Sequence, residues 1–235
     1  MLSIMVLNAK GGCGKTTLAT TLAAAYASRG YRTTLLDHDS QGSSEAWHRL
    51  RPPILPAIHL VPAYRQSGGA TRTWQLAPPP GTQRIVTDAP AGVHGLELED
   101  LVKRATAIVV PVLPSPIDIH AAADFVSDLR QLSRVREGRT RIGVIANRVR
   151  ENTLVYRSLE EFLNGLGVPF LTRLRDTQNY VKVAGLGMGV HEMAGSAFDR
   201  EREQWRPVLE WLRSIEQESR LGAVSAVPHR APGIA

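Results

Sequence analysis

The sequence predicts an α/β protein with a mostly parallel, twisted sheet and helices on both faces of that sheet. Short apolar runs alternate with longer amphipathic segments along most of the 235 residues. The apolar runs are nearly continuous, as in strands that are buried on both faces. A glycine-rich stretch also follows the first apolar run and precedes the first helical segment, an order typical of phosphate-binding α/β folds.

The predicted elements follow one another in this alternation. Strands are expected at residues 2–7, 33–36, 58–62, 84–87, 107–113 and 142–146. Helices are expected at residues 15–29, 96–104, 117–135 and 151–166. A last helix is expected from Ser196, whose spacing to Asp199 resembles a capping box. The Gly- and Pro-rich stretch 65–83 is expected to form a surface connection.

The length suits one domain with one core. We expect this domain to span residues 1–218 and residues 219–235 to form a flexible tail, because the tail is rich in small residues and proline. The single cysteine, Cys13, excludes an internal disulfide and suits a reducing compartment. Neither a secretion signal nor an apolar run of membrane-spanning length is present in the sequence. A cytoplasmic location without membrane contact is therefore expected.

The charge is positive overall, with a formal net charge of +6. Residues 130–175 contain ten arginines and four glutamates. A positive charge gathered in one region favours a polyanionic partner such as nucleic acid. The alternative is a solvated basic face whose arginines pair with carboxylates such as Glu201, Glu203 and Glu210.

Residues 8–17, NAKGGCGKTT, form a phosphate-binding loop between the first strand and the first helix. Glycines let the backbone N–H groups converge on phosphates, and the following helix contributes its N-terminal dipole. Lys15 is expected to neutralise the β- and γ-phosphates, and Thr16 to offer its hydroxyl group to Mg²⁺. The expected nucleotide contacts within the loop are Gly11, Gly12, Cys13, Gly14, Lys15 and Thr16.

Carboxylates follow two of the predicted strands. Asp88 ends the run RIVTD, and Asp37 and Asp39 end the run TTLLDHD. Carboxylates beside a phosphate repel it unless a metal ion, a lysine or water lies between them. This pattern favours a magnesium–nucleotide site in which one carboxylate orders the attacking water. The alternative, that these acids cap strand ends or helices, stays open for each of them taken alone.

Three motifs together resemble the ParA/MinD family of deviant Walker A ATPases: KGGCGKTT, the pattern DxDxQ at 37–41, and DAPAG at 88–92. The resemblance spans about residues 2–215 and implies a P-loop fold that binds ATP and Mg²⁺ and hydrolyses ATP slowly. In that family the first lysine of the motif reaches the partner's phosphates across a nucleotide-sandwich dimer. The resemblance therefore implies a homodimer in which Lys10 acts in trans, much as an arginine finger does.

The same resemblance implies a role for each further site residue. Asp39 would orient the hydrolytic water, Asp37 would lie close to the metal shell, and Asp88 would hold Mg²⁺ through water. Thr17 would contact the α-phosphate and Asn147 the adenine side. The implied catalytic residues are Lys10, Lys15 and Asp39, and the implied metal-site residues are Thr16, Asp37 and Asp88. The sequence departs from the family pattern at Ser40, where many relatives have proline, and at Cys13, where a small aliphatic residue is usual.

Within the family, the sequence is most similar to the short ParA type. The last residues contain Pro228 and Pro232 and no apolar face, so we do not expect the amphipathic targeting helix of MinD-like proteins. One cysteine also cannot share an iron–sulfur cluster between subunits. Because the phosphate loop begins near residue 8, we expect no DNA-binding domain before it. This type implies a nucleoid-associated bacterial ATPase that binds double-stranded DNA without sequence preference and is stimulated by a cargo-bound adaptor protein. The cargo would be a plasmid, a chromosome locus or a protein body such as a carboxysome.

Seven arginines are the candidate DNA contacts: Arg148, Arg150, Arg157, Arg173, Arg175, Arg202 and Arg206. Contacts to DNA phosphates need only clustered cations. A second function stays open on the same fold, an ATP-dependent ligase of the dethiobiotin-synthetase kind. Such a ligase would need a pocket for a substrate carboxylate near the γ-phosphate and no affinity for DNA.

Overall fold

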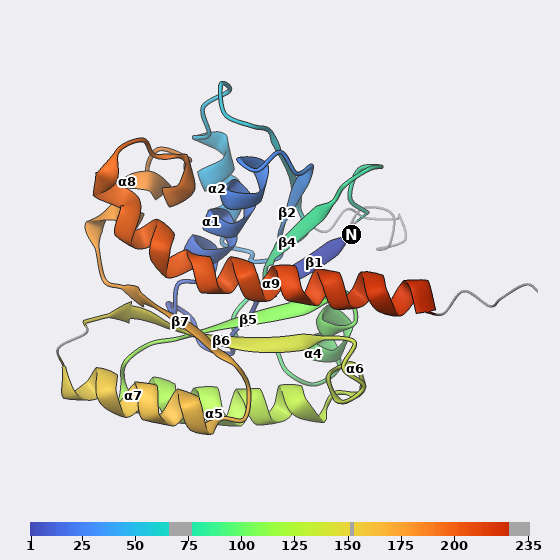
Figure 1. The fold of residues 1–235 in the computed structure, drawn as a ribbon, viewed down its shortest axis with the longest axis vertical. Coiled ribbons are helices and arrows are strands. Elements are labelled where there is room, and N and C mark those ends of the chain that lie inside the picture. The colour runs from blue at the N-terminus through green and yellow to red at the C-terminus, as the bar shows by residue number, and fades with distance from the viewer. Residues whose placement is uncertain (66–76, 151–152, 226–235) are drawn as a thin grey trace, which may run out of the picture.

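The computed structural model describes residues 1–65, 77–150 and 153–225, and in this part of the chain seven strands form one parallel sheet (Figure 1). The strand order is β3-β2-β4-β1-β5-β6-β7. The strands are β1 (Leu2–Val6), β2 (Thr33–Asp37), β3 (Ile58–Pro62), β4 (Arg84–Asp88), β5 (Ala107–Val112), β6 (Arg141–Val149) and β7 (Phe170–Arg175). The α/β class and the parallel sheet predicted from the sequence are confirmed.

Helices cover both faces of the sheet (Figure 1). One face carries α1 (Lys15–Ala27), α2 (Ser43–Arg49), α8 (Gln178–Ala184), α9 (Asp199–Ser225) and the short 3₁₀ helices η1 (Val190–Glu192) and η2 (Ser196–Phe198). The other face carries α4 (Gly95–Val102), α5 (Pro116–Gln131) and α7 (Leu154–Gly165), with α6 (Ser133–Arg136) following α5. Each face has its own apolar core, centred on residues such as Leu22 and Trp205 on the α1 face and Phe125 and Leu159 on the α5 face.

Several elements differ from the prediction. The strand β7 was not predicted, because Arg173 and Arg175 interrupt its apolar pattern; as an edge strand, β7 needs no continuous apolar run. The short helices α2 and α8 were also missed. The helix predicted over 117–135 is interrupted at Leu132, whose ψ of 137° is extended, and so forms α5 and α6.

The C-terminal helix begins three residues later than predicted, because 196–198 form the 3₁₀ turn η2 and α9 starts at Asp199. The residue that caps this turn is Gly195, so Ser196 lies inside η2 and not at the N-cap of α9. The helix continues through Pro207 to Ser225, past residue 218, where the sequence places the end of the domain. Residues 226–235 of the predicted tail and 66–76 of the predicted surface connection lie outside the described residues. Among the helices described, none combines the length and the apolar character that a membrane crossing requires.

Candidate nucleotide site

The phosphate loop lies at the carboxyl ends of the central strands. β1, which leads into the loop, lies between β4 and β5. Val6 is in register with Asp88 on β4, and Asp88 is in register with Asp37 on β2. Because parallel strands end at the same edge of a sheet, the loop and both carboxylates meet there, where ligands bind in open α/β sheets.

The conformation of the loop depends on two glycines with left-handed backbones, Gly12 (φ 75°) and Gly14 (φ 94°). Gly14 immediately precedes α1, so the free N–H groups of the first turn of α1 lie at the loop. A Cβ atom on Gly14 would also collide with Nδ2 of Asn147. Position 14 therefore requires glycine for its backbone and for the space that Asn147 occupies.

Asn147, near the end of β6, is buried and supports the loop directly. Its Nδ2 atom donates a hydrogen bond to the carbonyl oxygen of Cys13 at 2.8 Å. The adenine contact predicted for Asn147 stays a prediction; the observed contact is to the loop backbone. The next residue, Arg148, has a left-handed backbone (φ 53°), which is unusual outside glycine, and lies at an irregularity in the β6–β7 pairing.

The two lysines of the loop occupy different environments. Lys15 is buried, and its Nζ donates to the carbonyl oxygen of Lys10 at 3.0 Å. The Lys10 side chain is 38% exposed, and its Nζ lies 3.1 Å from Oδ1 of Asp118 in the first turn of α5. Lys15 therefore lies inside the loop, where phosphates would bind, whereas Lys10 lies at the surface, where a second molecule can reach it.

Asp37 organises the segment that follows β2. It is fully buried, and its two carboxylate oxygens accept hydrogen bonds from the backbone N–H groups of Asp39 (3.1 Å) and Glu45 (2.9 Å). Burial raises the pKa of Asp37, and these two hydrogen bonds lower it in part. Asp39 is half-buried and accepts a hydrogen bond from Gln41 N–H at 3.0 Å. Asp37 thus holds the turn that presents Asp39.

Asp88 has the properties expected of a residue near a metal ion. Its Oδ2 accepts a hydrogen bond from Ser44 Oγ at 2.8 Å, whereas Oδ1 is buried and accepts none within the described part of the chain. Burial raises the pKa of Asp88 to about 6; the hydroxyl groups of Thr16 and Ser44 act in the opposite direction. A cation beside Oδ1 would compensate this buried carboxylate.

Magnesium fits this arrangement better than a metal that needs a cage of protein ligands. The described residues contain no group of three or more His, Cys, Asp or Glu side chains that could hold a metal ion. Mg²⁺ typically uses one or two protein oxygens together with phosphates and water. Thr16 and Asp88 are the oxygen donors that the site offers.

Two contacts of the site were not predicted from the sequence. Ser44, in the first turn of α2, binds Asp88, and Asp118 binds Lys10. The pattern Ser115-Pro-Ile-Asp118 could have indicated a helix start, and Ser115 does cap α5, but no local signal indicates the distant contact to Lys10. Cys13 is buried in the loop, and burial raises the pKa of its thiol, as expected for a packing residue.

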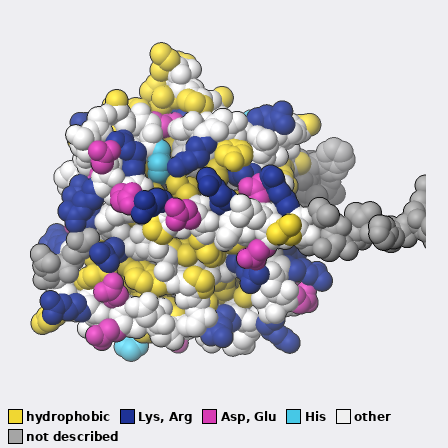
Figure 2. Space-filling model, in the orientation of Figure 1, with side chains coloured by type: hydrophobic (Ala, Val, Ile, Leu, Met, Phe, Trp, Pro, Cys, Tyr) yellow, Lys and Arg dark blue, Asp and Glu magenta, His cyan; other side chains and the backbone are white. Residues whose placement is uncertain are grey.

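Most of the seven candidate DNA-binding arginines are paired with carboxylates. The pairs are Arg150 with Asp176, Arg173 with Glu160, Arg175 with Glu201, Arg202 with Asp199, and Arg206 with Glu203 and Glu210. Figure 2 shows the resulting mixture of basic and acidic side chains along α9. Arg148 and Arg157 are exposed and have no carboxylate partner among the residues described. The sequence left open that the arginines form a solvated basic face paired with carboxylates and do not bind DNA. The ion pairs of Arg175 and Arg206 support this alternative at these two positions.

The sheet, the loop and its carboxylates define the fold of a P-loop nucleoside triphosphatase. The family described as the CobQ/CobB/MinD/ParA nucleotide binding domain matches residues 4–190, and the chain belongs to this family. It is similar to Maintenance of carboxysome distribution protein A from Halothiobacillus neapolitanus, with 28% identity over 177 residues that cover 72% of this chain and 77% of that protein. It is also similar to the chromosome-partitioning ATPase Soj from Thermus thermophilus, with 29% identity over 183 residues that cover 67% and 73% of the two chains.

Solved structures support the same fold. An ATP complex of a McdA variant from Cyanothece superposes with a TM-score of 0.69, at 12% identity, over 92% of this chain and 96% of that one. At this low identity the likeness concerns the fold alone. The match to the family model over residues 4–190 confirms, at the level of the family, the resemblance inferred from the three motifs.

Proposed function

We propose that this chain is an ATP-hydrolysing switch that forms a homodimer around ATP, binds DNA without sequence preference and positions a cargo inside the cell. The observation that carries this proposal is the contrast between its two loop lysines. Lys15 is buried within its own loop, whereas the Lys10 side chain is partly exposed and forms an ion pair with Asp118. A lysine in this position is available to the phosphates bound by a second copy.

The residues of the site have complementary roles in this proposal. Lys15 leaves the carbonyl oxygen of Lys10 and binds the β- and γ-phosphates. Thr16 and Asp88 would hold Mg²⁺, which would supply positive charge beside the phosphates. Asp39, presented by the turn that Asp37 fixes, orients the attacking water. Lys10 of each copy then adds positive charge at the partner's phosphates, which stabilises the transition state.

The relatives support a positioning role. One is named for the distribution of carboxysomes and the other for the partitioning of chromosomes. We infer a cargo of the same kind, with a protein body such as a carboxysome favoured, and a cargo-bound adaptor that stimulates hydrolysis. A cytoplasmic, nucleoid-associated location follows from the proposed DNA binding.

The dimer can be tested by light scattering with ATP, with ADP and without nucleotide. The wild-type chain should dimerise with ATP only. Lys10→Ala should bind nucleotide yet lose the dimer or its hydrolysis, and Asp39→Ala should form a dimer that persists because ATP is not cleaved. Lys103→Ala removes an exposed lysine of the same charge from the end of α4 and serves as the control. A Lys10→Ala variant that dimerises and hydrolyses ATP as the wild type does would contradict the proposal.

A further inference from the structure

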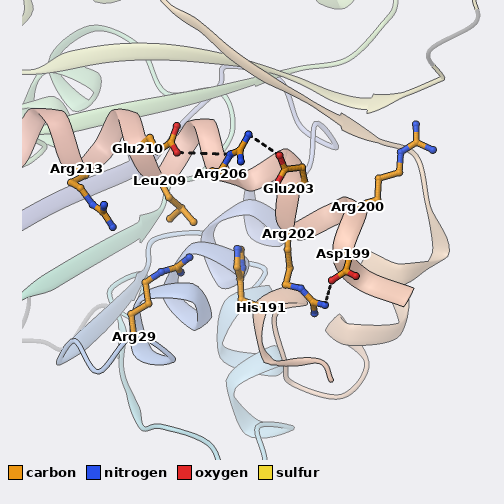
Figure 3. Close-up of a pocket in the computed structure, with 10 residues that line it drawn as sticks. All are labelled: Arg29, His191, Asp199, Arg200, Arg202, Glu203, Arg206, Leu209, Glu210 and Arg213. Atoms are coloured by element: carbon orange, nitrogen blue, oxygen red, sulfur yellow. Dashed lines mark hydrogen bonds and ion pairs between the residues drawn. The ribbon is translucent and has the colours of Figure 1, made fainter. Parts of the chain in front are cut away.

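A second concave site lies between the end of α1, η1 and α9 (Figure 3). It has a volume of about 680 Å³ and is lined by Arg29, His191, Asp199, Arg200, Arg202, Glu203, Arg206, Leu209, Glu210 and Arg213. Because α1 begins at the phosphate loop and rises about 1.5 Å per residue, Arg29 lies about 20 Å from that loop. This groove, called the α1–α9 groove below, is therefore separate from the nucleotide site.

Two arginines of the α1–α9 groove have no carboxylate partner among the described residues. Arg29 donates only to the carbonyl oxygen of Ala25, at 2.7 Å, and Arg213 takes part in none of the ion pairs found there. In Figure 3, both side chains extend into the space between α1 and α9. Burial lowers the pKa of Arg29, and the positive charge of Arg213 lowers it further. The two cations are thus close enough to repel each other.

His191 forms the floor of the same groove. Both of its ring nitrogens are buried and have no hydrogen-bond partner in the part of the chain described. Burial and the charges of Arg29 and Arg202 lower the pKa of His191 to about 4, so its ring is neutral near pH 7 and has one N–H group to donate. Figure 3 shows the ring pointing toward α9, between Arg29 and Arg202.

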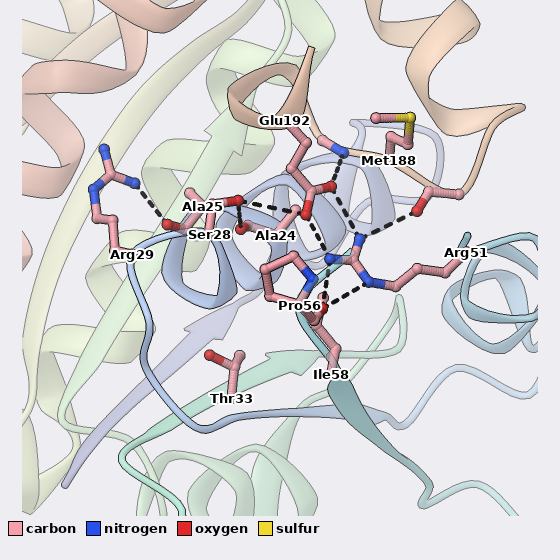
Figure 4. A network of polar contacts seen from close by, with 12 residues as sticks. Ala24, Ala25, Ser28, Arg29, Thr33, Arg51, Pro56, Ile58, Met188 and Glu192 are labelled. Atoms are coloured by element: carbon pink, nitrogen blue, oxygen red, sulfur yellow. Dashed lines mark hydrogen bonds and ion pairs between the residues drawn. The ribbon is translucent and has the colours of Figure 1, made fainter. Parts of the chain in front are cut away.

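The position of His191 is fixed by its neighbours. Its ring packs edge-on against Trp205, with centroids 6.2 Å apart. The adjacent residue, Glu192, forms a buried ion pair with Arg51 at 2.5 Å, and Arg51 also donates to the carbonyl oxygen of Gly187 (Figure 4). The groove floor is therefore held from the α2 side as well as by α9, so the unpaired imidazole is part of a rigid structure.

We propose that the α1–α9 groove binds a phosphate group, with Arg29 and Arg213 contacting its oxygens and the His191 N–H donating to it. An anion would remove the repulsion between the two arginines and give the imidazole the partner that it lacks. The planar guanidinium group of arginine donates two parallel hydrogen bonds, which match the spacing of phosphate oxygens. Arg29 after α1, His191 on η1 and Arg213 on α9 can therefore surround a tetrahedral anion from three sides. The phosphate would come from a DNA backbone or from a free phosphate compound; the first source rests on the DNA binding proposed above.

The proposal can be tested by NMR of the histidine ring signals of the Asp39→Ala variant while ATP and Mg²⁺ saturate its phosphate loop, because the proposed switch binds DNA in this uncleaved ATP state. Inorganic pyrophosphate and a 20-base-pair duplex are the two probes, and His191→Gln assigns the His191 signal. We expect one or both probes to shift this signal. Arg29→Gln and Arg213→Gln should each weaken the responding probe about tenfold. Arg220→Gln removes the same charge from α9 at a residue already paired with Glu216, and should leave the affinity within twofold.

The outcomes separate the two sources and the two proposals. A response to both probes, or to pyrophosphate alone, supports a site for free phosphate compounds, and a response to the duplex alone supports a site for the DNA backbone. The groove proposal is overturned if neither probe moves the His191 signal, or if Arg220→Gln weakens binding as much as Arg29→Gln does. ATP-dependent DNA binding that survives such a failure leaves the proposed function standing.

Discussion

The Nζ atom of Lys10 lies 3.1 Å from Oδ1 of Asp118, so the signature lysine of the loop is paired within its own chain. Lys10 must leave this ion pair to reach a partner's phosphates. Because the lysine is partly exposed, the pair contributes no more than about 1 kcal/mol. Asp118→Asn should therefore strengthen the ATP dimer by up to about fivefold for each of its two Lys10 residues, as measured by light scattering over a series of protein concentrations.

Asparagine preserves the shape of Asp118 at the start of α5, so the substitution tests the charge rather than the fold. Asp100→Asn, which breaks the exposed contact to Lys103 on α4, is the matched control and should leave the dimer unchanged. A weaker dimer in Asp118→Asn would mean that Asp118 assists Lys10 instead of competing with the phosphates.

Gly14 is predicted to be intolerant of any side chain. Gly14→Ala places a Cβ atom at a φ of 94° and against Nδ2 of Asn147, so we expect loss of nucleotide binding and a lower free energy of unfolding. Gly30→Ala is the control, since Gly30 has a similar φ of 82° with nothing within 4 Å of the added Cβ. Its cost should be the backbone strain alone, about 1–2 kcal/mol. Urea unfolding measures the loss of stability, and nucleotide titration measures the loss of affinity. Smaller losses in Gly14→Ala than in Gly30→Ala would contradict this explanation.

Asp88 should make the stability of the nucleotide-free chain depend on pH. Its pKa of about 6 lies above the ordinary aspartate value, so the folded chain binds this proton more tightly than the unfolded chain does. The resulting stabilisation is present at low pH and is lost as the pH rises through about 6. Asp88→Asn should therefore raise the free energy of unfolding by roughly 3 kcal/mol at pH 8 and by clearly less at pH 5. An equal effect of Asp88→Asn at both pH values in urea unfolding would contradict the assignment.

The ion pair between Arg51 and Glu192 should be important for stability, because its side chains are only 5% and 2% exposed. Arg51→Met leaves the Glu192 carboxylate buried without its charge partner, which typically costs about 3–5 kcal/mol. Arg139→Met breaks an exposed pair with Glu137 and should cost no more than about 1 kcal/mol. Chemical denaturation measures the free energy of unfolding of both variants. Equal losses of this free energy would mean that the buried pair contributes no more than a surface pair.

The sequence predicts the parts of this fold that depend on local patterns. Six strands, the phosphate loop and the positions of Asp37 and Asp88 follow from apolar runs and from the residues that end them. The edge strand β7 was missed because Arg173 and Arg175 give it no continuous apolar signal. Contacts between distant segments were also missed, since Arg51 and Glu192 are 141 residues apart and no local pattern connects them.

The same limit applies to the basic face. The sequence shows which segments are rich in arginine, but carboxylate partners are decided by packing. Arg175 pairs with Glu201, which is fully buried, so its charge serves the contact between β7 and α9. Arg29 was not a candidate before the fold placed it beside Arg213 and His191.

The most direct test of the proposed switch is binding to long, non-specific duplex DNA with ATP, with ADP and without nucleotide, at two salt concentrations. We expect binding with ATP only, and a steep loss of affinity at higher salt as counterions compete for the phosphates. Lys10→Ala should reduce this binding, because the dimer presents twice the positive surface. Equal affinity in all three nucleotide states, or no binding in any of them, would contradict the proposed switch.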